Sequence, residues 1–265
     1  MDVWLIRHGS TVPGEEGRYQ GFLDESLSEK GRTALVRAPF CPSHVYVSPA
    51  KRARETAAIL FPEAEQICLP GLWEMNFGLF EGRTWKEMEN DPQYREWVDG
   101  MCLGTCPGGE SRAEFSDRVC KAFQSILAME KEWQKRQTLI LPAEDASAED
   151  ASAGCQGNPD RGDFKEQGKA DLFIVSHGGT QMAILEKWGR PARDYYDWQR
   201  PCGCGWKLAL HKVDGGDPKP DQTEAAVYST LELHVLEELC FVQNPIIMQL
   251  SGPYFPESDD SRSFS

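Results

Sequence analysis

VWLIRHGST, residues 3–11, joins a short apolar run to an abruptly polar end. The four leading residues are apolar, which is typical of a strand buried on both faces of a parallel sheet. Arg7, His8 and Gly9 follow directly. In open α/β sheets, ligands bind in the crevice beyond the carboxyl ends of the strands. We therefore expect Arg7 and His8 to face a ligand crevice.

The same pattern recurs late in the chain, where LFIV at residues 172–175 leads into Ser176, His177, Gly178 and Gly179. The chain has five histidines, and two of them stand at the ends of its two most apolar strands. One histidine in such a place is usually structural. Two histidines, each followed by glycine, favour a shared site, because glycine leaves backbone amides uncovered beside a ligand.

The length and charge of the chain limit its partners. A chain of 265 residues fits a single α/β domain with insertions. Its formal net charge of -14 disfavours binding to nucleic acid or to an anionic membrane, since both need clustered cations. No apolar run approaches the roughly 20 residues that span a bilayer, and no signal peptide precedes the first strand. We expect a cytoplasmic protein, in which an anionic substrate requires a local basic pocket.

The nine cysteines are expected to be reduced thiols, because they are odd in number and the chain carries no sign of export. Cys102 with Cys106, and Cys202 with Cys204, are the pairs closest in sequence. Neither pair has the two-residue gap of a zinc knuckle, and no histidine follows at finger spacing. We predict no metal site and no cofactor.

The rest of the chain alternates between apolar strands and amphipathic helices. A polar loop is expected over 12–24, and a helix starts near 26–31 with Ser26 or Ser28 as its cap. Further strands are predicted over 44–47, 67–69, 206–213 and 228–235, the last near the sheet edge. Helices are predicted over 50–60, 84–99, 110–135 and 180–188.

Residues 143–169 differ in composition from the rest. They open with the repeat AEDAS, twice, and are otherwise rich in Gly, Asp and Gln. Such a segment cannot bury enough apolar surface to order itself, so we expect a disordered acidic insertion. Residues 251–265 are polar and are expected to form a flexible tail, which leaves residues 1–250 as one domain.

Arg52 completes a candidate phosphate site with Arg7, His8 and His177. It lies just inside a helix start that faces the same strand-end crevice. Two guanidinium groups match the oxygens of a phosphoryl group without a metal. A neutral His8 imidazole can attack phosphorus to give a phosphohistidine, while His177 donates to an equatorial oxygen.

Glu74 is a carboxylate within a largely apolar run, LWEMNFGLF at residues 72–80. An unpaired buried charge is costly, so Glu74 is either paired with one of the arginines or serves as an acid. As an acid, it protonates the leaving alkoxide and later takes a proton from the attacking water. The sequence has no Walker loop, nucleophile elbow or nearby carboxylate pair for magnesium, which favours metal-free transfer through histidine.

Four motifs stand in a fixed order: LIRHG at 5–9, SPAKRA at 48–53 with ETA at 55–57, LWE at 72–74 with FG at 77–78 and EG at 81–82, and SHGG at 176–179. They resemble the histidine phosphatase superfamily, also called the phosphoglycerate mutase-like family, over residues 1–213 apart from the insertion. The resemblance implies an α/β fold with a doubly wound, mostly parallel sheet, one antiparallel strand and helices on both faces. It also implies a phosphohistidine at His8, phosphate ligands Arg7, Arg52 and His177, and a proton donor at Glu74.

Further phosphate contacts are expected from Gly9, Thr11, Gln20, Gly21 and Gly178. Gln20 falls where the family often supplies such a contact. The family commonly has Asn where this chain has Gly14, so one side-chain contact is missing or is replaced by backbone or by Gln20.

Three further stretches look like the phosphatase branch of the family, in particular the α-ribazole-5'-phosphate phosphatases of cobalamin synthesis: FGLFEG at 77–82, PGGES at 107–111 and YDWQ at 196–199. The expected function is a phosphomonoesterase that acts on a small phosphorylated metabolite, as a monomer or homodimer. A phosphoglycerate mutase and a broad-specificity sugar phosphatase are alternatives within the fold. An inactive module that binds a phosphorylated ligand is an alternative from another class, against which both histidines and Glu74 argue.

Overall fold

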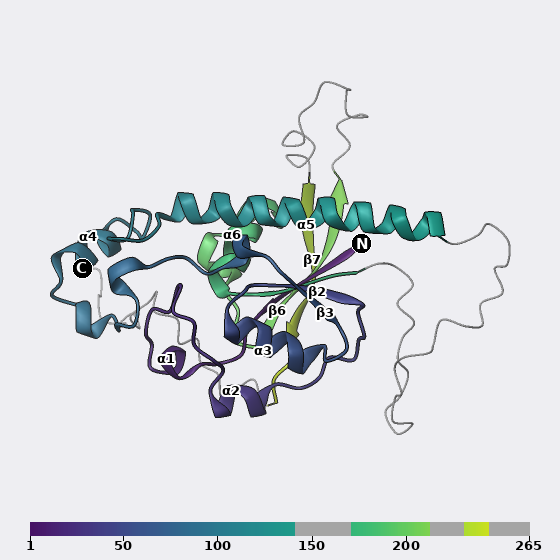
Figure 1. Ribbon diagram of the computed structural model, residues 1–265. Coiled ribbons are helices and arrows are strands. Elements are labelled where there is room, and N and C mark those ends of the chain that lie inside the picture. Colours follow the sequence, from purple (N-terminus) through teal and green to yellow (C-terminus); the bar gives the residue numbers. More distant parts are fainter. Residues whose placement is uncertain (141–170, 213–230, 244–265) are drawn as a thin grey trace, which may run out of the picture.

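The computed structural model describes residues 1–140, 171–212 and 231–243 (Figure 1). Its centre is a seven-stranded sheet in the order β3-β2-β4-β1-β6-β7-β5. The strands are β1 (Asp2–Arg7), β2 (His44–Val47), β3 (Glu65–Cys68), β4 (Leu172–Ser176), β5 (Gly189–Arg190), β6 (Cys204–Lys212) and β7 (Leu231–Cys240). β6 runs antiparallel to both β1 and β7, and the other neighbouring pairs are parallel. This confirms the predicted sheet with one antiparallel strand.

Helices connect and cover these strands. The α-helices are α1 (Val12–Glu15), α2 (Glu29–Ala34), α3 (Lys51–Leu60), α4 (Pro92–Asp99), α5 (Arg112–Ile140) and α6 (Gly178–Trp188), and the 3-10 helices are η1 (Pro70–Leu72), η2 (Gly78–Phe80), η3 (Lys86–Met88) and η4 (Tyr195–Trp198). Figure 1 shows α5 and α6 on one side of the sheet and α2 and α3 on the other. The prediction of helices on both faces is confirmed.

The alternation of side chains along β1 builds two cores. Val3 and Leu5 belong to an apolar cluster that includes side chains of α5 and α6. Trp4 and Ile6 belong to a second cluster that includes side chains of α3. Successive strand residues point to opposite faces, and each fully buried apolar side chain contributes about 1.5–3 kcal/mol. β1 is therefore fixed from both sides, and its carboxyl end holds a constant position.

Two predicted segments differ from the structure near a helix start. The predicted helix over 84–99 is interrupted, with η3 and α4 as separate elements. Asp91 precedes Pro92, a position that disfavours helical backbone, and its carboxylate caps α4 by accepting from Gln93 N at 3.1 Å. The predicted loop over 12–24 opens with the short helix α1, which Thr11 caps by accepting from Gly14 N at 3.1 Å.

Cys204 and Cys240 form a disulfide between β6 and β7, so the prediction of reduced thiols is wrong for this pair. The antiparallel register places the two residues directly opposite, with Cα atoms 4.1 Å apart. A pairing between strands 36 residues apart in sequence carries no local signal. Six other cysteines of the described ranges are free, and within those ranges no cluster of His, Cys, Asp and Glu is arranged to hold a metal ion.

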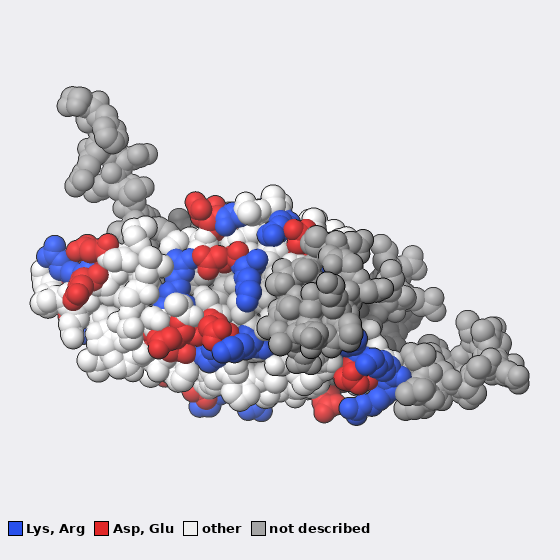
Figure 2. All heavy atoms as spheres, turned by 90° about the horizontal axis from the view of Figure 1, so that it is seen from above, with Lys and Arg blue, Asp and Glu red and all other residues white. Residues whose placement is uncertain are grey.

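The described surface carries charges of both signs. Figure 2, which views the molecule from the α5 side, shows Lys and Arg interspersed with Asp and Glu. In the part of the chain that the structure describes, no helix has the length and apolarity to cross a bilayer. The predicted insertion at 143–169 and tail at 251–265 lie outside the described residues, so these and the single domain over 1–250 stay predictions.

Candidate active site

The carboxyl ends of β1 and β4 open into one pocket. It is lined by residues from several separated parts of the chain: Arg7, His8, Ser10, Thr11, Gly14, Glu15, Arg18, Gln20, Gly21, Arg52, Glu74, Phe77, Gly178, Gly179, Met182, Gln199 and Cys202. All of the predicted site residues except Gly9 and His177 are in this lining. The structure therefore brings together groups from the start of the chain, from α3, from the segment before η2 and from α6.

The two exceptions adjoin lining residues in the sequence, since Gly9 follows His8 and His177 precedes Gly178. Gly9 N donates to Thr56 Oγ1 at 2.9 Å, so this amide fixes the end of β1 against α3. The His177 ring meets the His8 ring edge-on, with ring centroids 5.1 Å apart. The two imidazoles that sequence alone placed at strand ends thus share one site.

His8 has the tautomer that a nucleophile needs. Its Nδ1 lies 2.7 Å from Gly9 O, and because a carbonyl only accepts, Nδ1 carries the proton. Burial lowers the pKa of His8 well below 6.5, and the cations of Arg52 and Arg7 lower it further. The ring is therefore neutral at pH 7, with the lone pair on Nε2.

His177 is fully buried and bonded on one side only. Its Nε2 lies 2.7 Å from the Oγ of Ser48, the residue that directly follows β2. Burial lowers the pKa of His177 well below 6.5, with smaller contributions from Arg52 and His8. The ring is neutral and its Nε2 is hydrogen-bonded to Ser48. Its Nδ1 is therefore available to bind an oxygen of a ligand.

The two guanidinium groups are held by carbonyls. Arg7 Nη1 donates to Arg200 O at 2.8 Å, and Arg52 donates from Nη1 to Leu23 O at 2.7 Å and from Nη2 to Gly21 O at 2.9 Å. Arg52 is only 1% exposed, and burial lowers the pKa of its guanidinium below the usual value. A carbonyl dipole orients a cation without cancelling its charge, so both arginines keep their charge for an anion.

The Glu74 carboxyl is oriented by two backbone amides. Its Oε1 accepts from Met75 N at 2.9 Å, and its Oε2 accepts from Gly179 N at 3.0 Å. A Cβ at Gly179 would overlap the carboxyl of Glu74, so the glycine leaves room for this carboxyl to reach the amide. No ion pair in the described ranges involves Glu74, although pairing with an arginine was one interpretation of the sequence. The structure thus places the Glu74 carboxyl in the pocket without an arginine partner, and its role as an acid stays a prediction.

Four buried nitrogens around the pocket have no hydrogen-bond partner among the described residues. They are Arg7 Nε, Gln20 Nε2, Arg52 Nε and His177 Nδ1. A buried polar group without a partner costs about 1–3 kcal/mol, so four of them in one place indicate a site built for a ligand rich in oxygen. A phosphoryl group has the charge and the number of acceptor oxygens that such a set requires.

Gln199 and Cys202 line the pocket, although sequence analysis assigned neither to the site. They lie between η4 and β6, next to Gly203. The Gly203 amide contacts the carbonyls of Arg7 and His8, at 3.1 and 3.0 Å, which holds this segment against the end of β1. Gly203 has a φ of +74°, a backbone conformation that favours glycine, so this glycine is a signal in the sequence for the bend. The contact between this segment and β1 joins distant parts of the chain and has no such signal.

The lowered pKa values of His8 and His177 predict a pH-dependent stability. Below pH 6.5 histidines of the unfolded chain take up protons that these two buried rings do not, so the free energy of unfolding decreases as the pH falls below that value. We expect the melting temperature to drop between pH 7 and pH 5, and to drop less in His177→Gln. His211→Gln, at an exposed histidine of β6, is the control and should melt with the wild-type pH dependence. Equal slopes in His177→Gln and wild type would contradict this origin.

The fold and the pocket define a protein of the histidine phosphatase type. The chain belongs to the histidine phosphatase superfamily, since the family model for branch 1 of that superfamily matches residues 3–141. An adenosylcobalamin/alpha-ribazole phosphatase of Salmonella typhimurium is 34% identical over 216 residues, which cover 77% of this chain and 88% of that protein.

Two further similarities cover different shares of the chain. A probable phosphoglycerate mutase GpmB of Erwinia tasmaniensis is 30% identical over 138 residues, which are 49% of this chain and 64% of that protein. The chain thus matches less than two thirds of the length of this mutase relative. The crystal structure of an alpha-ribazole phosphatase from Shigella flexneri superposes with a TM-score of 0.58 at 22% identity, covering 92% of this chain and 100% of that one. It confirms the phosphoglycerate mutase-like fold.

Proposed function

We propose that the protein is a phosphomonoesterase that hydrolyses a small phosphorylated metabolite through a phosphohistidine at His8. The observation that carries this proposal is the set of four unpaired nitrogens around a neutral His8, with the Glu74 carboxyl in the same pocket. Arg7 and Arg52 supply the positive charge that metal ions supply in many phosphoryl-transfer enzymes, so the proposed reaction needs no metal.

In the first half of the reaction, His8 Nε2 attacks phosphorus while the bond from phosphorus to the leaving oxygen breaks. Glu74 gives its proton to that oxygen, and the alcohol departs. Arg7, Arg52 and His177 bind the equatorial oxygens and stabilise their charge in the transition state. In the second half, water attacks the phosphohistidine, Glu74 takes a proton from the water, and the bond from Nε2 to phosphorus breaks to release phosphate.

The charges around the pocket mouth favour a phosphatase over a mutase. A mutase has to hold a phosphorylated product for return transfer, which requires cations for a second anionic group. Among the described lining residues, Arg18 is the cation besides Arg7 and Arg52. It is paired with Glu16 at 2.6 Å and with Glu87 at 3.1 Å, so its charge is already balanced. This supports a leaving group without a second negative charge.

The Salmonella and Shigella relatives are named for alpha-ribazole phosphate, and this compound is therefore the first substrate to test. A panel of α-ribazole 5'-phosphate, sugar phosphates and phosphoglycerates, followed by phosphate release, tests the proposal. Interconversion of phosphoglycerates that depends on a bisphosphate primer would favour the mutase instead. Phosphate binding without turnover of any substrate would favour the inactive binding module.

Glu74→Gln is expected to lower kcat/KM by about 10²–10⁴-fold on alkyl phosphates, because an alkoxide needs a proton to leave. The loss in kcat/KM on p-nitrophenyl phosphate is expected to be far smaller, since nitrophenolate departs as a stable anion. The comparison uses kcat/KM because this constant covers only the steps up to departure of the alcohol, whereas kcat also includes the attack of water that Glu74 assists. Glu114→Gln, at an exposed carboxylate bonded to Ser111, is the control. Equal losses on both substrates would argue against Glu74 as the proton donor.

A further inference from the structure

Glu74 stands on a segment without regular structure. Residues 73–77 lie between η1 and η2 and belong to no helix or strand. Backbone carbonyls and amides of such a segment lack the partners that a helix or a sheet provides, and need others. The groups that bind this backbone therefore determine where the Glu74 carboxyl lies.

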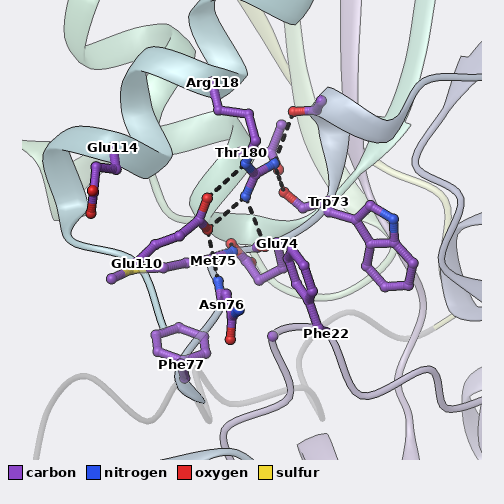
Figure 3. A network of polar contacts seen from close by, with 12 residues as sticks. Phe22, Trp73, Glu74, Met75, Asn76, Phe77, Glu110, Glu114, Arg118 and Thr180 are labelled. Carbon is purple, nitrogen blue, oxygen red and sulfur yellow. Dashed lines mark hydrogen bonds and ion pairs between the residues drawn. The ribbon is translucent and has the colours of Figure 1, made fainter. Parts of the chain in front are cut away.

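Arg118 of α5 binds carbonyls of this segment and of η1, which precedes it (Figure 3). Its Nη1 donates to Gly71 O and to Trp73 O, both at 3.1 Å, and its Nη2 donates to Glu74 O at 3.2 Å. Its Nε and Nη2 also donate to the two carboxylate oxygens of Glu110, both at 2.8 Å. A guanidinium has five N–H donors, so Arg118 uses its whole donor set on this segment and on Glu110.

Glu110 continues the contact on the other side of Glu74. Its Oε2 accepts from Asn76 N at 2.9 Å, and its own backbone N donates to Asn76 O at 2.8 Å. Figure 3 shows Glu74 between these two sets of contacts. The paired hydrogen bonds between Arg118 and Glu110 fix both side chains in one plane, which gives the arrangement a defined geometry.

Neither Arg118 nor Glu110 is among the residues that line the pocket. They contact the Glu74 segment through the backbone from 71 to 76, and the Arg118 charge also lowers the pKa of His177. Met75 N, which is one of the two amides that orient the Glu74 carboxyl, lies inside this bound segment. A change in the contacts of Arg118 or Glu110 therefore moves the Glu74 carboxyl and leaves the phosphate-binding groups in place.

We propose that Arg118 and Glu110 are positioning residues for proton transfer, which hold the Glu74 carboxyl at the leaving oxygen. The proposal rests on the proposed function and deepens it. In the step concerned, the bond from phosphorus to oxygen breaks, the electron pair stays on the oxygen, and the Glu74 proton moves to it. Residues that only stabilise the fold affect all substrates alike, whereas positioning residues affect the substrates that need this proton.

The test compares Arg118→Met and Glu110→Gln on an alkyl phosphate and on p-nitrophenyl phosphate. A misplacement of about 1 Å costs on the order of 10²-fold in rate, so we expect kcat/KM on the alkyl phosphate, which covers the steps up to departure of the alcohol, to fall by about that factor. On p-nitrophenyl phosphate the loss is expected to be far smaller. Arg118→Lys is expected to recover part of the activity at most, because an ammonium cannot reach the three carbonyls and the carboxylate together.

A double variant separates positioning from a general defect. In the Glu74→Gln background the proton donor is already absent, so Arg118→Met is expected to cause no further loss on the alkyl phosphate. Lys121→Met is the control, because Lys121 lies one turn along α5 in an exposed ion pair with Asp117. It should leave both rates at the wild-type value.

Any other outcome contradicts the proposal, and each such outcome indicates a different role for the two residues. Equal losses on both substrates, or additive losses in the double variant, would identify Arg118 and Glu110 as residues of the fold alone. Wild-type rates in both single variants would show that contacts other than those of Arg118 and Glu110 position residues 73–77. If Arg118→Met does not fold, Glu110→Gln, which keeps the size of the side chain, decides the question. A wild-type protein that turns over neither substrate would overturn the proposed function itself.

Discussion

His8→Ala is expected to form no phosphoenzyme and to lose on the order of 10⁴-fold or more in kcat, the largest effect expected of a single change in this protein. The reason is that His8 combines a free Nε2 with a pKa held low by burial and by two arginines. His177 shares the site, but its Nε2 is bonded to Ser48 and its Nδ1 is expected to bind an oxygen of the phosphoryl group. Rapid quenching with a radiolabelled substrate measures the covalent intermediate, which should be labile to acid and stable to base.

The matched control for this experiment is His234→Ala, at an exposed histidine on β7. It should give the wild-type amount of labelled protein. Thermal melting of both variants establishes that they are folded. A normal yield of labelled adduct in His8→Ala would place the nucleophile elsewhere and would remove the basis of the proposed mechanism.

Arg52→Lys is expected to lower kcat/KM on the order of 10³-fold, although it keeps the positive charge. Two of the Arg52 nitrogens are fixed by the carbonyls of Gly21 and Leu23, and Nε is left without a partner among the described residues. An ammonium is a single point charge and cannot make the two carbonyl contacts and a contact to phosphate in one plane. Binding of inorganic phosphate, measured by calorimetry, is expected to weaken together with kcat/KM.

Arg54→Lys is the control, because Arg54 lies on the same helix and its side chain is exposed. It should bind phosphate and turn over substrate as the wild type does. Wild-type affinity for phosphate in Arg52→Lys would show that the guanidinium of Arg52 is not a ligand of the phosphoryl group.

Patterns in the sequence predicted six of the seven strands, all but the short β5, and eight of the 17 residues that line the pocket were among the expected site residues. The apolar runs before Arg7 and Ser176 mark β1 and β4, because a strand buried on both faces needs such runs. The two imidazoles follow these strands, and parallel neighbouring strands bring their carboxyl ends to the same edge. His8 and His177 therefore lie close together because β1 and β4 are parallel neighbours. The order of the motifs in the sequence already implied this topology.

Contacts between distant parts of the chain could not be predicted in the same way. The bond from Gly9 to Thr56, the disulfide from Cys204 to Cys240 and the five contacts of Arg118 depend on register and on the packing of α5. In the sequence Arg118 is one charged residue among many on a long amphipathic helix. Only the folded molecule shows that it faces the backbone of Glu74.

The way in which Arg7 and Arg52 are held has a further consequence. Carbonyls hold both guanidinium groups, so an arriving anion has no carboxylate to displace. If the proposed function holds, inorganic phosphate is expected to compete with the substrate for the same donors. The rate of hydrolysis should then follow the phosphate level of the surroundings, slowing when phosphate is plentiful and rising when it is scarce.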